Sequence, residues 1–224
     1  MKYQGIKFTL LLLALIAKSV AEGTPEDKIP RPERAVYQIT GESEITYAVG
    51  VKILLAFDRT VSGKTSDVTG TIRLNEEALA EPAAQQNTVS GELFVDVAGF
   101  RSGIGKRDAN VRELLESDKY PRIKFTLFNI EPNSNLNPES LSGVYFVTGN
   151  LEIRGRTKEV SFPVVISPKG KKLAIDGSFF MRLTDFGVTP PTVLIFVGQA
   201  SDEVALSVHL IAESKKPGMF STES

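Results

Sequence analysis

His209 is the only histidine in the 224-residue chain, which contains no cysteine. A serine–histidine–aspartate triad would have to use His209, but the chain has no Gly-x-Ser-x-Gly nucleophile elbow. A typical zinc site combines several histidine or cysteine ligands, which this composition does not supply. The absence of cysteine also excludes disulfides and thiolate nucleophiles. We therefore predict a hydrogen-bonded histidine on a strand, no catalytic residue, no metal and no cofactor, so we expect no enzyme.

Three other motifs are typical of enzymes but lack the context that their chemistry needs. Gly63-Lys64-Thr65 matches the end of a phosphate-binding loop, yet Asp58 stands where that loop requires glycine. Asp185-Phe186-Gly187 matches the metal-binding tripeptide of kinases, but no glycine-rich loop or His-Arg-Asp loop accompanies it. The adjacent acids Glu76 and Glu77 lie in an expected loop, so no carboxylate pair is placed on facing walls for glycoside hydrolysis. We interpret the first two motifs as turns.

A short helical pattern runs directly into a strand pattern over residues 106–125. Asp108 stands where an N-cap residue is expected, because its carboxylate can accept hydrogen bonds from free backbone N–H groups. Apolar residues at helical spacing follow it. Tyr120-Pro121 predicts the end of the helix, since the residue before proline disfavours the helical region. One short amphipathic helix is therefore expected within a run of strands.

Nearly every other segment alternates apolar and polar residues with the period of a β-strand. Short glycine-containing turns join these segments, which predicts antiparallel neighbours rather than βαβ units. About eight to ten strands with one apolar face must hide that face in a closed barrel or a sandwich, and only the barrel has no free edges. Glycines within the strand patterns indicate strand bending or close approach of a ligand; they are Gly70, Gly91, Gly149 and Gly177.

The two ends of the chain differ in composition from the middle. Residues 1–21 have the features of a secretory signal peptide: lysines, a short uncharged run and the cleavage site Ser19-Val20-Ala21. The alternative is an N-terminal membrane anchor, although the apolar run is short for a span. Residues 22–35 are charged and proline-rich, which predicts a disordered leader, and residues 214–224 a loose tail. The remaining chain has more acidic than basic residues, which argues against nucleic acid as a partner.

Three segments together resemble the YceI-like family of periplasmic polyisoprenoid-binding proteins. The first is Arg107-Asp-x-x-x-Arg112 followed by Tyr120-Pro-x-Ile-x-Phe125, and the second is Thr148–Val160 leading to Phe162-Pro163-Val164. The third is Asp185-Phe-Gly-Val188 with the prolines and strand that follow. The segments occur in family order and cover roughly residues 37–213.

The resemblance implies an all-β, antiparallel, lipocalin-like closed barrel over residues 36–213, in a periplasmic or secreted protein that carries an isoprenoid or quinone-type lipid. We expect the apolar strand faces to form the ligand wall: Phe57, Leu93, Phe125, Tyr145, Val147, Phe162, Phe179 and Met181. Basic and polar residues at the helix entrance are expected to hold a phosphate or quinone head group: Arg101, Arg107, Asn110 and Arg112. The family often has histidine at the position of Asn110, so this chain departs from the family there.

Other interpretations of the same pattern remain open. The basic cluster at the helix entrance is also consistent with a solvated loop. The barrel could be a packed, stress-related structural protein without ligand, because a filled core and a lined cavity give the same apolar alternation. It could also be an enzyme acting on an isoprenoid-like substrate, which would need convergent polar groups inside. Oligomerisation is possible and not specified by the sequence.

Overall fold

The computed structural model describes residues 34–53, 59–75, 89–133, 142–193 and 198–214. The predicted signal peptide, almost all of the predicted leader and tail, and the predicted wall residue Phe57 lie outside the described residues. Ala35 begins the first strand and Ser214 ends the last, so each lies in the barrel rather than in the leader or tail. No helix in the described ranges is long and apolar enough to cross a membrane.

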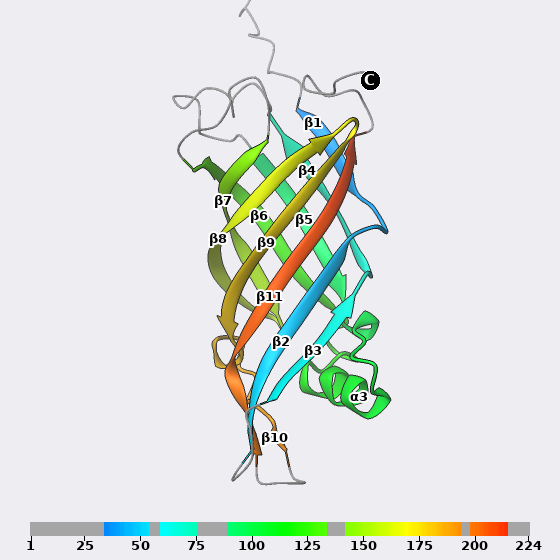
Figure 1. Ribbon diagram of the computed structural model, residues 1–224, viewed down its shortest axis with the longest axis vertical. Coiled ribbons are helices and arrows are strands. Elements are labelled where there is room, and N and C mark those ends of the chain that lie inside the picture. The colour runs from blue at the N-terminus through cyan, green and yellow to red at the C-terminus, as the bar shows by residue number, and fades with distance from the viewer. Residues whose placement is uncertain (1–33, 54–58, 76–88, 134–141, 194–197, 215–224) are drawn as a thin grey trace, which may run out of the picture. The chain divides into compact units, whose positions relative to one another are not determined.

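The described chain is built from antiparallel strands (Figure 1). The strands are β1 (Ala35–Ile39), β2 (Glu44–Ile53), β3 (Arg59–Thr65), β4 (Val68–Leu74), β5 (Val89–Asp96), β6 (Arg122–Pro132), β7 (Gly143–Ile153), β8 (Arg156–Lys169), β9 (Lys172–Arg182), β10 (Thr192–Val193) and β11 (Gly198–Ser214). The helical elements are η2 (Val97–Gly99), α3 (Gly105–Leu114) and η3 (Leu183–Phe186).

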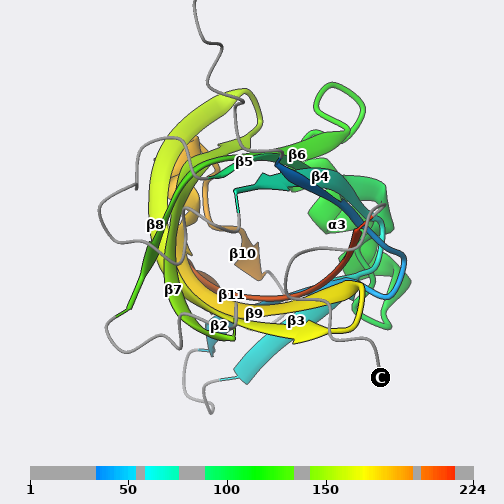
Figure 2. The same cartoon turned by 90° about the horizontal axis from the view of Figure 1, so that it is seen from above.

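Eight strands close into a ring in the order β1-β4-β5-β6-β7-β8-β9-β11, because β1 pairs with both β4 and β11 (Figure 2). The long strand β11 has two partners on the same edge. Its end pairs with β1, with Ile39 opposite Ala212, and the rest of its length pairs with β2, with Glu44 opposite His209. The predicted closed antiparallel barrel with one short α-helix is confirmed over the described residues.

The inward faces follow the alternation seen in the sequence. On β7, buried residues alternate with exposed or partly exposed ones, and Val147, Leu151 and Ile153 all face inward. Phe162 and Val164 on β8 are buried beside them. Because side chains on a strand alternate between faces, this pattern directs one face of each strand into the barrel.

Helix α3 differs from its prediction at both ends. Its N-cap is Ile104, which offers no side-chain cap, and Asp108 lies inside the helix. The Asp108 carboxylate instead accepts hydrogen bonds from the backbone N–H (2.8 Å) and hydroxyl (2.5 Å) of Ser102, so it anchors the preceding loop to the helix. The helix ends at Leu114, before Tyr120-Pro121, because Glu116 adopts a positive φ of 50° that an α-helix cannot continue.

Glycines within the strands make room for neighbouring side chains. A Cβ at Gly149 would collide with the ring of Phe125 on β6, and a Cβ at Gly63 would lie 2.6 Å from the ring of Tyr47 on β2. Gly63-Lys64-Thr65, interpreted from the sequence as a turn, therefore belongs to β3. Close ring packing explains the glycine there. Asp185-Phe186-Gly187 does form a tight turn, in which Gly187 ends η3 at a φ of 66°.

Candidate functional site

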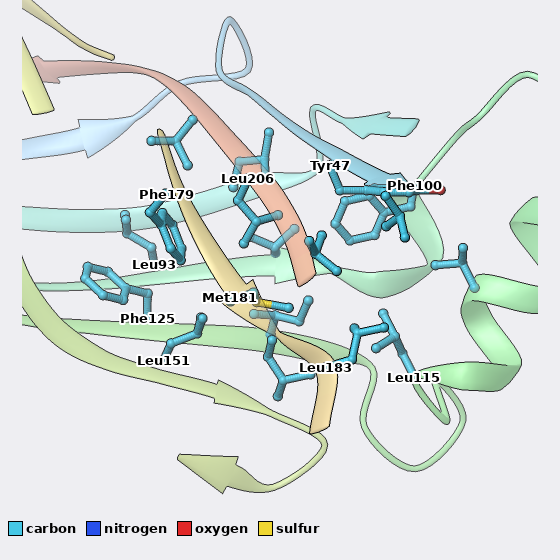
Figure 3. A pocket seen from close by; sticks show the side chains of 18 of the residues that line it. Tyr47, Leu93, Phe100, Leu115, Phe125, Leu151, Phe179, Met181, Leu183 and Leu206 are labelled. Atoms are coloured by element: carbon cyan, nitrogen blue, oxygen red, sulfur yellow. The ribbon is translucent and has the colours of Figure 1, made fainter. Parts of the chain in front are cut away.

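A cavity of about 1050 Å³ occupies the interior of the barrel. Figure 3 shows side chains from several strands and from the end of α3 surrounding it. Most lining residues are aliphatic or aromatic, and the lining comes from β2 to β11 and the α3 region. The side chains of this barrel therefore leave an open cavity rather than a filled core. The volume of the cavity is at the upper end of the range for ordinary ligand pockets.

Six of the eight wall residues predicted from the sequence line this cavity: Leu93, Phe125, Val147, Phe162, Phe179 and Met181. Tyr145 is only 1% exposed and packs in the core, but it does not line the cavity. Burial raises the pKa of its phenol to about 12. Phe57 lies outside the described residues. The cavity thus lies on the face chosen from the alternation, and contact of these residues with a ligand stays a prediction.

Three aromatic rings form a continuous strip on the cavity wall. Phe162 and Phe179 stack with ring centroids 4.3 Å apart, and the centroid of Phe125 lies 6.0 Å from that of Phe162. Gly149 on β7 gives the Phe125 ring room to lie against the sheet. Large flat side chains of this kind give an apolar ligand a broad surface with little conformational freedom to lose.

The mouth of the cavity lies at the α3 end of the barrel. The lining residues that are also solvent-exposed belong to three segments: the start of β3, residues 104–113, and residues 191–192. In Figure 1, the start of β3, helix α3 and strand β10 all lie toward the same end of the barrel. Toward the opposite end the described lining residues, such as Leu74, Ile166 and Leu173, are all buried.

The predicted head-group residues divide into two pairs. Arg107 and Asn110 line the cavity at its mouth. Arg101 and Arg112 are not lining residues. The Arg101 guanidinium donates to the carbonyl oxygens of Ala98 (2.5 Å) and Phe100 (2.9 Å), so it holds the preceding turn.

Two further cations line the mouth, Lys106 beside Arg107 and Arg59 on β3. Lys106 belongs to the basic cluster visible in the sequence. Arg59 lies more than forty positions earlier, and no sequence pattern connects it with that cluster; pairing of β2 with β3 brings it there.

Hydrogen bonds and ion pairs fix α3 and the loop before it. Lys64 on β3 and Arg101 exchange two backbone hydrogen bonds of 2.8 Å. At the other end of the helix, Arg154 in the β7–β8 turn forms an ion pair with Glu116 and donates to the carbonyl oxygen of Gly187. The segment that borders the mouth is thus held from both sides.

Electrostatics at the mouth follow from these contacts. Hydrogen bonds from the hydroxyl and then the backbone N–H of Ser102 hold the pKa of the Asp108 carboxyl below its ordinary value, with help from nearby arginines. Burial raises the pKa of Tyr47, and the charge of Arg107 partly offsets that rise. Tyr47 lines the cavity and packs edge-on against Phe100 at 5.6 Å.

His209 lies apart from the cavity. It is exposed on the outer face of β11, where its Nδ1 atom is 2.6 Å from a carboxylate oxygen of Asp176 on β9. This agrees with the hydrogen-bonded strand histidine expected from the sequence. Within the described ranges, no group of three or more histidine, aspartate or glutamate side chains is arranged to hold a metal ion.

The fold has known counterparts among solved structures. The BcnA protein of Burkholderia cenocepacia is 20% identical, with a TM-score of 0.58 over 77% of this chain and 98% of its own. The Campylobacter jejuni YceI protein is 20% identical, with a TM-score of 0.56 over 74% of this chain and 91% of its own. A polyisoprenoid-binding domain from Saccharophagus degradans, implicated in plant cell wall breakdown, is 11% identical, with a TM-score of 0.56 over 81% of this chain and 99% of its own.

Sequence comparison gives a more specific result. No curated protein matches the chain. The profile of the YceI-like domain, however, matches residues 37–212, which include all or most of every strand of the closed barrel. The chain therefore belongs to the YceI-like family.

Proposed function

We propose that this barrel binds one elongated apolar chain of an isoprenoid or quinone-type lipid and shields it from water, without making or breaking a bond. The observation that carries the proposal is the cavity of about 1050 Å³, whose wall is apolar along its depth and polar at its mouth. An amphiphile has the matching distribution, with a long tail and a polar head.

The energetics of such binding are sufficient. Burying carbon gains roughly 0.8 kcal/mol per CH₂-sized group, so a chain of roughly twenty carbon atoms offers about 16 kcal/mol. Association costs on the order of 4–15 kcal/mol. A net gain of about 8 kcal/mol, which corresponds to micromolar affinity, is therefore within reach of a tail of this length.

The family supports the same ligand class. The related domain from Saccharophagus degradans is described as polyisoprenoid-binding. An enzyme would need reactive groups that converge inside the barrel, whereas the charged side chains lining this cavity belong to its mouth: Arg59, Lys106, Arg107 and Glu113. This distribution favours a carrier over the enzyme that the sequence left open.

We further propose that the protein is exported to the periplasm or secreted, with cleavage after Ala21. The support is the lysine-containing N-terminus, the short uncharged run and the small residues before the site. Edman sequencing of the mature protein should begin at Glu22. Recovery of a cytoplasmic protein that retains Met1 would contradict this part of the proposal.

Mass spectrometry of an organic extract tests the binding proposal. Protein purified from its native source without detergent should carry a lipid with a long apolar tail in about equimolar amount. Titration of the delipidated protein with a long-chain quinone should then give micromolar affinity, and the same quinone without its tail should bind at least 100-fold more weakly. Absence of both lipid and titratable binding would leave the structural barrel as the better account.

A further inference from the structure

A large apolar side chain is exposed at the mouth of the cavity. Ile104 is 51% exposed, lines the cavity and is the N-cap of α3, a position where serine, threonine, aspartate or asparagine is usual. Isoleucine contributes no capping hydrogen bond there. Its presence is therefore not explained by helix stability, and exposed apolar residues rimmed by polar ones are typical of contact surfaces.

Cations surround Ile104. Lys106 and Arg107 follow it on α3, Arg59 lies on β3 at the same mouth, and Arg101 precedes it. In the described part of the chain no ion pair within 4.0 Å is found for these four side chains. The acid in the segment from Arg101 to Arg112 is Asp108, which is 8% exposed and bonded to Ser102; Glu113 is the acidic residue that lines the mouth.

This local charge contrasts with the whole chain, whose formal net charge is −1. Basic residues also occur elsewhere on the surface, but among the described lining residues of the cavity three cations, Arg59, Lys106 and Arg107, accompany one acid, Glu113. Each lysine or arginine near an anionic bilayer strengthens attachment by about fivefold, and an apolar side chain that enters the interface adds to this. The chemistry of the mouth thus complements a negatively charged lipid surface.

We propose that the segment Arg101–Arg112, together with Arg59, docks the mouth on an anionic lipid bilayer. Ile104 enters the interface, Lys106, Arg107 and Arg59 contact lipid phosphates, and the cavity opens directly onto the membrane. The docking is inferred only from the residues at the mouth. Its purpose rests on the proposed function: an apolar chain would pass between bilayer and barrel without crossing water. The paired backbone bonds of Lys64 with Arg101 hold the start of this segment against β3.

The test uses the full mature protein and two kinds of vesicle, pure phosphatidylcholine and phosphatidylcholine with about one third phosphatidylglycerol. The mouth variant combines Ile104→Ser with Lys106→Gln. Serine is a favoured N-cap residue, so this change removes the apolar side chain without weakening the helix. The control variant combines Phe180→Ser, on the outer wall and 71% exposed, with Lys171→Gln in the β8–β9 turn.

Flotation of ligand-free protein measures docking. We expect the wild type to bind anionic vesicles at least tenfold more tightly than neutral ones and to lose this preference in 0.5 M salt, because salt screens the contacts. The mouth variant should lose at least tenfold in affinity, and the control variant should stay within twofold of wild type. The proposal would be overturned if the wild type bound both kinds of vesicle equally or if the mouth variant kept the wild-type affinity. It would also be overturned if the control variant lost affinity instead, which would place the membrane contact on the outer wall.

Two further measurements separate docking from ligand binding. With dansyl-labelled farnesol as the probe, the mouth variant should transfer probe from anionic vesicles at least tenfold more slowly than wild type. Because Ile104 and Lys106 also line the cavity, the affinity of both proteins for the probe is measured in vesicle-free buffer, and the loss in transfer rate should exceed any loss in that affinity at least tenfold. A transfer loss no larger than the affinity loss would refute the role of docking. If wild type binds no probe in buffer, the proposed function fails while flotation still judges the docking. If transfer proceeds at a rate independent of vesicle concentration, the chain travels through water and direct passage is refuted.

Discussion

Val147→Lys tests whether the apolar wall holds a ligand. Val147 lies on β7, is 7% exposed and lines the cavity, with Ile130 opposite it on β6 and Phe162 opposite it on β8. A lysine there would extend its ammonium group into the cavity. Water can solvate that group while the cavity is free, but an apolar chain would displace the water and leave the charge unpaired.

The magnitude follows from the protonation of the lysine. At pH 7, release of a proton from an amine of pKa about 10.4 costs about 4.6 kcal/mol, at 1.36 kcal/mol per pH unit. This cost is the upper limit of the binding penalty, because the neutral amine can be buried instead. We therefore expect the affinity for a long-chain quinone to fall by between about 100-fold and 2000-fold at pH 7. The penalty should shrink by about tenfold per pH unit at higher pH, since binding favours the neutral form and lowers the lysine pKa.

The assay is titration with the quinone from pH 7 to pH 10, with folding checked by circular dichroism and thermal unfolding. Glu152→Lys is the matched control, because Glu152 lies on the same strand with its side chain exposed on the outer face. Its affinity should stay within about twofold of wild type. A folded Val147→Lys protein that binds within threefold at pH 7, or whose loss does not change with pH, would refute the assignment of the wall.

Two further predictions concern the structure that supports the site. Gly149→Ala should lower the free energy of unfolding, measured by urea denaturation, by about 1–3 kcal/mol, because the added Cβ collides with the Phe125 ring. The control is Gly41→Ala, where a Cβ meets nothing within 4 Å, and it should change the free energy of unfolding little. Equal effects of the two substitutions would contradict the packing argument. Asp108→Asn tests the low pKa of Asp108. Because Ser102 stabilises the ionised form, the charge contributes stability above the ordinary carboxyl pKa, and this contribution is lost as the pH falls through the lowered folded-state value. The stability difference between wild type and Asp108→Asn should therefore be constant near neutral pH and shrink on acidification below about pH 4; a difference independent of pH would refute it.

The apolar alternation of the strands predicted an antiparallel β barrel or sandwich and much of the cavity wall, and the family resemblance selected the closed barrel. Val147, Phe162 and Phe179 face the cavity because side chains on a strand have a period of two, so the sequence pattern itself specifies which face is apolar. The same local logic predicted the strand placement of His209. These conclusions depend only on residues close together along the chain.

Helix α3 marks the limit of that local logic. Asp108 has the residue type of an N-cap, yet Ile104 holds the position, because Ser102 and the Lys64–Arg101 pairing anchor the loop in a different register. Capping preference contributes only about 1 kcal/mol. Several tertiary hydrogen bonds outweigh it, so the start of the helix was decided by contacts that the sequence does not display.

The mouth of the cavity likewise depends on the tertiary structure. Arg59 on β3 and Lys106 on α3 are far apart in the sequence, and each is an ordinary surface cation when considered alone. Closure of the sheet brings them to one opening beside Ile104. By itself the sequence determined which strand faces are apolar, because that follows from a two-residue period; the open cavity, its mouth and the residues around it were decided by strand order and register, which depend on pairings between distant segments.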